Sequence, residues 1–243
     1  GNVDLTSIPN TVTPCAASST GSVGLLETDT LSVGSVGAFG TLAALNGITA
    51  NNGVSIRTVA GSVTQTAAGV ITAGNAGLAV AVTGGNIALA TATNATNLVA
   101  FSGAGTIAYK TSSDLTVGEV AQLGTNGKVT GAVATTSLAL TTTGAATVIT
   151  QSELINTPAL TLATGAAGKI TLTDGGNLIG SVQSSGTWGT AAHTISDSAG
   201  GLNVGPITSN GNVSLSTSGG GLTVTGAVNV GANTLTLTAS GDN

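Results

Sequence analysis

Two consecutive blocks of about twenty residues at the end of the chain resemble each other, and this repetition constrains the fold more than any other feature. Residues 201–204 (GLNV) match residues 221–224 (GLTV), and Leu215 matches Leu237. Within each block aliphatic residues alternate with Asn, Ser or Thr, which is the pattern of half-buried strands. A block this short cannot bury its apolar face alone, so the blocks are expected to stack as a β-solenoid.

A longer repeat runs through most of the chain. Residues 31–36 (LSVGSV) return as residues 115–120 (LTVGEV) and again as residues 202–207 (LNVGPI). A second marker, residues 63–65 (VTQ), returns as residues 149–151 (ITQ). The spacings of 84, 87 and 86 residues indicate a super-repeat of about 85 residues that holds about four coils.

These repeats predict an all-β chain in which residues 31–243 form a parallel β-solenoid made of nearly three super-repeats. We expect about a dozen coils of about 20 residues, with neighbouring coils about 4.8 Å apart. Residues 1–30 differ because they hold Pro9 and Pro14, and proline weakens a strand ladder. This segment is therefore predicted to be an N-terminal arm or end cap.

Composition excludes several classes of function. Charged residues make up 5% of the chain and aromatic residues 2%. The only cationic side chains, apart from histidine, are those of Arg57, Lys110, Lys128 and Lys169. No basic face exists to neutralise phosphates, so nucleic acid is not an expected partner. No apolar run is long enough to cross a bilayer, so membrane insertion is not expected. The chain begins at Gly1 without a signal sequence, which suggests a processed mature chain or a piece of a longer one.

Several segments share a short strand that follows glycine. They are residues 61–65 (GSVTQ), 69–74 (GVITAG), 84–89 (GGNIAL) and 211–215 (GNVSL). This pattern resembles the repeats of filamentous-haemagglutinin-type exoproteins over roughly residues 31–240. The resemblance implies a right-handed parallel β-helix that is secreted by a bacterium and forms surface fibres, as an adhesin or a biofilm component.

Residues that could carry chemistry are few. His193 is the only histidine, and Asp197 follows four residues later, so a Ser/His/Asp arrangement is conceivable. Serines are so common here that one near His193 is expected by chance. We expect His193 on the surface, in a longer loop of residues 186–197 that also holds Trp188, the only tryptophan. Trp188 either caps a coil edge or, like His193, contacts a partner or glycan.

Acidic residues and the single cysteine complete the candidates. Polysaccharide-cleaving β-helices need clustered carboxylates, but the pairs Asp114 with Glu119 and Glu27 with Asp29 are expected to solvate a surface. One Cys and one His cannot build a zinc cluster. We therefore assign no catalytic, cofactor-binding or metal-binding residue and predict that the chain is not an enzyme. Cys15 is either free or forms an intermolecular disulfide between two copies.

These features predict an extracellular structural protein of a bacterial cell surface. The strand expected at residues 234–239 has little sequence after it to cap its edge, and an open edge can pair with another copy. We therefore expect a head-to-tail homopolymer that forms a fibre, sheath or adhesive stalk. The alternative is an excised segment of a large adhesin that binds a receptor or glycan on a host or neighbouring cell.

A further alternative is an ice-binding solenoid. This function would need the same threonine-containing motif at the same place in successive coils. Residues 170–173 (ITLT) and 235–238 (LTLT) fit that motif, but the outward residues vary along the chain, as at Asn203, Ser214 and Thr223. The regularity of the outward array on one face would separate ice binding from a purely structural role.

Overall fold

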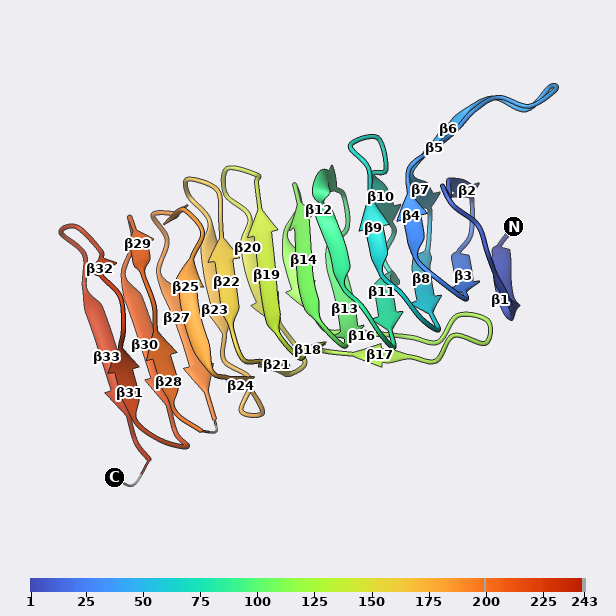
Figure 1. The fold of residues 1–243 in the computed structure, drawn as a ribbon. Coiled ribbons are helices and arrows are strands. Elements are labelled where there is room, and N and C mark those ends of the chain that lie inside the picture. Colours follow the sequence, from blue (N-terminus) through green and yellow to red (C-terminus); the bar gives the residue numbers. More distant parts are fainter. Residues whose placement is uncertain (199, 242–243) are drawn as a thin grey trace.

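The computed structural model describes residues 1–198 and 200–241 and shows a parallel β-solenoid of about 11 turns of about 22 residues (Figure 1). The predicted all-β solenoid is therefore confirmed, with turns slightly fewer and longer than the dozen coils of about 20 residues expected. Each turn repeats the direction of the one before it, so strands of successive turns pair in parallel. The right-handed winding stays a prediction.

The largest sheet has fourteen strands and runs the length of the solenoid. Its main path consists of β1 (Val3–Asn10), β3 (Val23–Glu27), β8 (Gly53–Thr58), β11 (Gly77–Val82), β13 (Leu98–Gly103), β15 (Leu115–Val117), β20 (Val148–Gln151), β23 (Lys169–Leu172), β27 (His193–Asp197), β30 (Val213–Thr217) and β33 (Leu235–Ala239). Beside this path lie β18 (Ala132–Ala134), β21 (Ile155–Thr157) and β24 (Leu178–Ile179). The sheet thus presents one continuous outer face along the rod.

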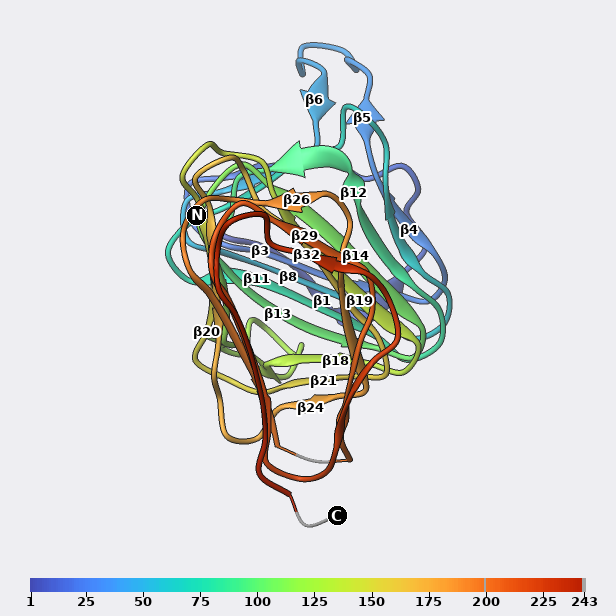
Figure 2. The same ribbon diagram turned by 90° about the vertical axis from the view of Figure 1, so that its left-hand side faces the viewer.

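A nine-stranded sheet forms the opposite wall, as the view along the rod shows (Figure 2). Its strands are β4 (Leu31–Val33), β9 (Val63–Gln65), β12 (Ile87–Asn94), β14 (Thr106–Thr111), β19 (Ser137–Thr142), β22 (Leu160–Ala163), β25 (Ser181–Ser184), β28 (Leu202–Val204) and β31 (Leu222–Val224). Two three-stranded sheets lie at the corner between the walls. One holds β2 (Ala17–Ser19), β7 (Ile48–Ala50) and β10 (Ile71–Ala73), and the other holds β26 (Thr187–Trp188), β29 (Ile207–Ser209) and β32 (Val228–Asn229).

Two antiparallel hairpins leave the coil. The first pairs β5 (Ser35–Val36) with β6 (Leu45–Asn46), and the second pairs β16 (Glu119–Val120) with β17 (Val129–Thr130). The β5–β6 hairpin projects away from the body at the N-terminal end, whereas the β16–β17 hairpin lies along the side of the rod and points toward the N-terminus (Figure 1).

The core is a continuous stack of inward-facing aliphatic side chains between the walls. In the fourteen-stranded sheet Val23, Val54, Leu78 and Val99 occupy one register position in successive turns, and all four are buried. The sequence alternation places these side chains inward because successive residues of a strand point to opposite faces. Stacking therefore gives each turn the apolar surface that it cannot bury alone.

Successive copies of the super-repeat place their equivalent strands on opposite walls of the solenoid. Leu31, Leu115 and Leu202 begin β4, β15 and β28, and all three are buried. However, β4 and β28 belong to the nine-stranded sheet, whereas β15 belongs to the fourteen-stranded sheet. Equivalent strands of successive copies thus lie on opposite walls, so one copy contains an odd number of half-turns rather than about four whole coils. The hairpins account for part of the difference, because residues 35–46 and 119–130 lie outside the coil.

The first thirty residues form the end turn of the solenoid. They supply β1 and β3 to the fourteen-stranded sheet and β2 to a corner sheet. The repeat continues into this segment, because Asn10 Nδ2 donates to the Leu5 carbonyl over 3.0 Å and Asn94 Nδ2 donates to the Leu89 carbonyl over 2.9 Å. These residues are related by the same spacing of 84. The hydrophobic positions agree at this spacing too, since Val3 and Leu5 align with Ile87 and Leu89.

Candidate assembly and binding surfaces

The two ends of the described solenoid have open strand edges. At the C-terminal end, β31, β32 and β33 are the last strands of their sheets, and Val224, Leu235 and Leu237 are exposed there. At the N-terminal end, β1, β2 and β4 are the first strands, and Leu5 and Ile8 are exposed. The edge of β4 is covered in part, because Cys15 pairs with Val33 through backbone hydrogen bonds. The fourteen-stranded wall and one corner therefore offer strand edges at both ends, which is the arrangement that can add another strand.

The β16–β17 hairpin is held against the outer face of the fourteen-stranded sheet. Beneath it a column of small residues, Gly24, Ser55, Ala79 and Ala100, occupies equivalent positions in four successive strands. Val120 and Val129 of the hairpin are buried against Ala79 and Ala100. Small side chains leave room for a second layer here, so this part of the sheet is a docking platform.

Buried hydrogen bonds fix the far end of this hairpin. Asn126 Nδ2 donates to the Leu25 carbonyl over 2.9 Å and to Ser55 Oγ over 3.2 Å. The backbone N–H of Thr125 donates to Thr6 Oγ1 over 2.7 Å. These contacts reach back across β8 and β3 to β1, so the hairpin clamps the N-terminal turns together.

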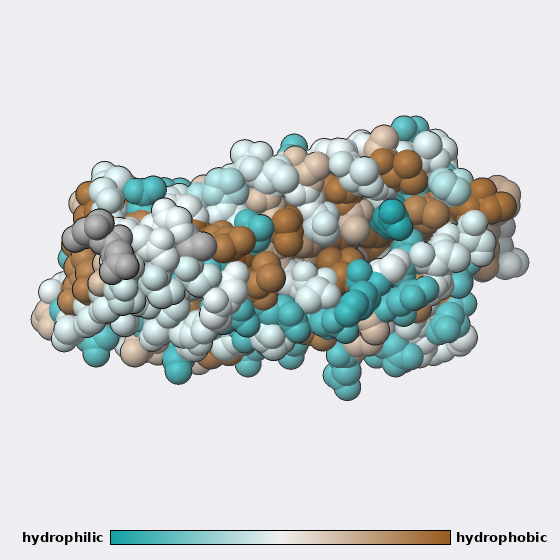
Figure 3. Space-filling view, turned by 90° about the horizontal axis from the view of Figure 1, so that it is seen from below, coloured by the Kyte–Doolittle hydropathy of each residue, from teal (hydrophilic) through white to brown (hydrophobic). Residues whose placement is uncertain are grey.

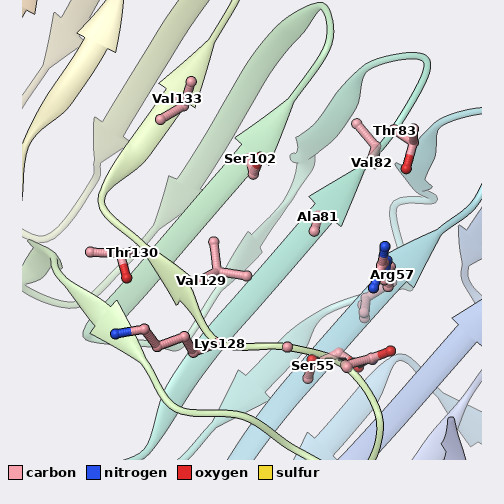
Figure 4. A pocket seen from close by; sticks show the side chains of 13 residues that line it. Ser55, Arg57, Ala81, Val82, Thr83, Ser102, Lys128, Val129, Thr130 and Val133 are labelled. Atoms are coloured by element: carbon pink, nitrogen blue, oxygen red, sulfur yellow. Dashed lines mark hydrogen bonds between the residues drawn. The ribbon is translucent and has the colours of Figure 1, made fainter.

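A groove of about 500 Å³ lies between this hairpin and the sheet. Figure 4 shows Arg57 at one side of the groove and Lys128 at the other, with Ala81 and Ser102 between them. Lys128 Nζ lies 2.8 Å from Glu119 Oε2, and the hydrogen bond from Lys128 lowers the pKa of Glu119 while raising that of Lys128. Figure 3 views this side of the molecule, where hydrophilic atoms gather over one half and apolar atoms reach the surface along the middle. The groove is lined by the Arg57 guanidinium and by hydroxyl groups such as that of Ser102, whereas the Lys128 ammonium is paired with Glu119.

The C-terminal half of the same outer face has a different character. Here a column of hydroxyl residues runs through six successive strands, from β15 to β33. It consists of Thr116, Thr150, Thr171, Thr194, Ser214 and Thr236. We call this the threonine column. Neighbouring hydroxyls approach each other, since Thr116 Oγ1 and Thr150 Oγ1 are 3.1 Å apart.

The sequence alone did not indicate this column, because outward residues that are near one another in the sequence belong to different walls. Asn203 and Thr223 are in β28 and β31 of the nine-stranded sheet, whereas Ser214 is in the column. The signal was the middle residue of the repeated triplets, such as residues 170–172 (ITL) and 235–237 (LTL). Strand register was needed to recognise that these triplets face the same way.

Trp188 and His193 lie in the interior. The expected surface loop at residues 186–197 instead forms β26 and β27, because the turn is completed by stacking on its neighbours. Trp188 Nε1 donates to the Leu162 carbonyl over 2.9 Å, and the Trp188 and His193 rings pack 5.2 Å apart. Burial lowers the pKa of His193, whose Nε2 atom lies 2.9 Å from the Gly189 carbonyl oxygen. A partner could reach either side chain only if this turn opened.

The carboxylates of Asp197 and Asp114 accept hydrogen bonds from backbone N–H groups or from a neighbouring hydroxyl. Asp197 Oδ1 accepts from the Ile179 N–H over 2.7 Å, and Asp197 Oδ2 accepts from Thr217 Oγ1 over 3.2 Å. Asp114 Oδ1 accepts from the Val148 N–H over 3.0 Å. Among the residues that the structure describes, no three His, Cys, Asp or Glu side chains gather as metal ligands would.

Cys15 is a free, buried cysteine near the N-terminal end. Burial, with a smaller contribution from the charge of Glu27, raises the pKa of its thiol to about 11. The Glu27 side chain is itself buried, and burial raises its pKa although Oε2 accepts from the Val12 N–H over 3.0 Å. The thiolate is therefore scarce near neutral pH, so an intermolecular disulfide would first require this end turn to loosen.

Comparisons with protein families, with curated proteins and with solved structures find no match. Within residues 1–198 and 200–241, no helix has the length and apolar character needed to cross a bilayer. The surfaces described above are therefore the basis for assigning a role.

Proposed function

We propose that this chain is an extracellular structural protein of a bacterial surface, which stacks end to end into a fibre, sheath or adhesive stalk. The open edges at both ends of the solenoid carry this proposal. Each strand that ends the rod, β33, β31 and β32, has a counterpart of the same wall or corner at the other end, in β1, β4 and β2. A second copy placed in line could continue the fourteen-stranded sheet and the corner, and such a head-to-tail contact propagates rather than closes.

The interior favours a mechanical role. The core cluster runs from Cys15 to Leu215 without interruption, so stability is shared between neighbouring turns. The acidic groups described above are engaged in structural contacts rather than brought together around a cleft. A cell surface, receptor or glycan as a further partner stays a prediction, and the groove between Arg57 and Lys128 is its candidate contact.

Microscopy and light scattering test the stacking. For residues 1–243 we expect rods that lengthen with protein concentration and repeat axially at about 50 Å, the length of about 11 turns spaced at the strand separation. Leu237→Lys should shorten the rods because it places a charge on the open edge of β33. Leu178→Lys is the matched control, since Leu178 is 39% exposed and Leu237 38%. Single short rods at every concentration, from protein that circular dichroism shows to be folded, would exclude stacking.

The threonine column favours a second candidate function, which is binding to ice. Hydroxyl groups repeat along the column at the strand separation of about 4.8 Å, close to an oxygen repeat of the ice lattice. Every member except Ser214 adds a methyl group. A flanking row continues the pattern, because Ser196, Ser216 and Thr238 are also paired in register. Such a surface could hold a layer of ordered water in an ice-like arrangement.

Ice recrystallisation assays test this candidate. We expect the unmodified chain to slow crystal growth, and Thr150→Lys with Thr194→Lys to abolish the effect because two bulky charges interrupt the column. Thr64→Lys with Thr161→Lys is the matched control, since these half-buried threonines lie on the opposite wall. Equal loss in both pairs, or no activity in the unmodified chain, would rule out ice binding by this face.

A further inference from the structure

The β5–β6 hairpin is the repeat equivalent of the β16–β17 hairpin. Residues 35–46 align with residues 119–130 at a spacing of 84 without a gap. The two turns are alike, because the bridge between Phe39 and Leu42 has its counterpart between Leu123 and Asn126. Gly40 and Gly124 both have φ of +59°, a conformation that glycine adopts without steric cost. The same local structure is therefore built twice.

The surroundings of the two hairpins differ. In the β16–β17 hairpin Val120 is 4% exposed, Val129 is 9% and Asn126 is 2%. At the equivalent positions of the β5–β6 hairpin, Val36 is 40% exposed, Leu45 is 41% and Leu42 is 70%. Phe39 at the tip is 83% exposed. The positions that docking buries in one hairpin are thus apolar and open to solvent in the other.

The sequence of the β5–β6 hairpin also lacks the polar side of its counterpart. The ion pair of Glu119 with Lys128 faces solvent in the docked hairpin. Ser35 and Ala44 occupy these two positions in the first copy. A small hairpin with exposed phenylalanine and leucine and no charge is unfavourable in water, because apolar surface is left hydrated. Its composition is that of an element buried in an interface.

The direction of the hairpin identifies where a receiving surface would lie. The docked hairpin leaves β15 and runs back over earlier turns of its own chain. The β5–β6 hairpin leaves β4, which ends the nine-stranded sheet, and points past the N-terminal turn (Figure 1). In the stacked fibre, the C-terminal turns of the neighbouring copy occupy that space.

We propose that the β5–β6 hairpin is a latch that docks on the last turns of a second copy of this chain. This proposal rests on the end-to-end stacking proposed above. The receiving surface is the corner at which the chain leaves the nine-stranded sheet, which is also where the hairpin starts. At this corner the last turns carry small or compact residues, Gly205 and Pro206 before β29 and Gly226 and Ala227 before β32. Like the small-residue column under the β16–β17 hairpin, these residues have side chains small enough to leave room for a second layer.

Sedimentation of a hairpin variant tests the latch. Phe39→Ser with Leu42→Ser should weaken association of residues 1–243 at least about tenfold, since interface energy concentrates in a few apolar anchors. Val59→Ser with Leu178→Ser is the matched control, because these exposed side chains lie outside the hairpin and the ends. The control pair should associate as the unmodified chain does.

Directed cross-linking provides a second readout. In a Cys15→Ser background, chains carrying Phe39→Cys are mixed with chains carrying Ala227→Cys, and a disulfide-linked heterodimer is expected. If the unmodified chain associates but the hairpin variant associates equally well and no cross-link forms, the latch is overturned while stacking survives. If the unmodified chain remains a monomer, both proposals are overturned, and the hairpin has another occupant such as preceding turns of a longer chain.

Discussion

Replacing Asn94 with alanine is expected to lower the free energy of unfolding by roughly 3 kcal/mol or more, because it leaves several buried polar groups without partners. Asn94 is fully buried in β12. Its Oδ1 atom accepts from Gln65 Nε2 over 2.6 Å and from the Ile71 N–H over 2.8 Å. Its Nδ2 atom donates to the carbonyls of Leu89 over 2.9 Å and Lys110 over 3.0 Å.

The size of this effect follows from the position of the amide between turns. Asn94 joins three successive turns, since Gln65, Asn94 and Lys110 belong to β9, β12 and β14. At a bulge in β12 the regular ladder is interrupted between Leu89 and Asn94. The side chain therefore supplies hydrogen bonds that the backbone does not.

Denaturant unfolding followed by circular dichroism measures the loss. Asn177→Ala should have a similar effect, because Asn177 Oδ1 likewise accepts from Gln151 Nε2 over 2.8 Å and from the Ile155 N–H over 2.9 Å. Asn51→Ala is the control, since Asn51 is exposed. A loss below about 1 kcal/mol for Asn94→Ala would show that the network contributes little net stability.

The fold could be predicted from the sequence because alternating apolar and polar residues mark half-buried strands, and this alternation can be recognised residue by residue. Leu31, Leu115 and Leu202 were expected to be equivalent inward positions, and all three are buried at the start of a strand. The wall to which each belongs could not be predicted, since that depends on how many residues leave the coil. Residues 31–36 and 115–120 served only as markers of the super-repeat, and their sequence does not show that the chain leaves the coil after Val33 and Val117.

The candidate surfaces were harder to predict than the fold. The threonine column can be recognised only when the register between successive strands is known. Repeats of unequal length do not define that register. The β16–β17 hairpin is docked and the β5–β6 hairpin is exposed because their neighbouring strands differ. The sequences of the two hairpins are too similar to predict this difference. Trp188 was expected at an edge or a surface, because a lone aromatic residue in a polar segment gives no sign of the cavity that neighbouring turns provide.

Trp188→Ala is expected to reduce the free energy of unfolding by about 3–5 kcal/mol, the usual cost of deleting a large buried aromatic side chain. Trp188 is fully buried, its indole N–H donates to the Leu162 carbonyl, and its ring packs on His193. Removal would leave a cavity and take away one of the two hydrogen bonds of the Leu162 carbonyl, which also accepts from the Ser185 N–H over 3.0 Å. Trp188→Phe separates these effects, because it fills most of the cavity but removes the indole hydrogen bond, at a cost of about 0.5–1.5 kcal/mol.

The pKa of His193 tests whether Trp188→Ala opens a cavity beside the His193 ring. Burial holds the pKa of His193 below its ordinary value, so the unfolded chain takes up a proton at this imidazole before the folded chain does. The unmodified protein should therefore lose stability as pH falls below about 6.5. In Trp188→Ala, water reaches the ring, its pKa should rise in NMR titrations, and this pH dependence should weaken. If the stability and the His193 pKa of Trp188→Ala both match those of the unmodified chain, Trp188 is not packed in the core as described.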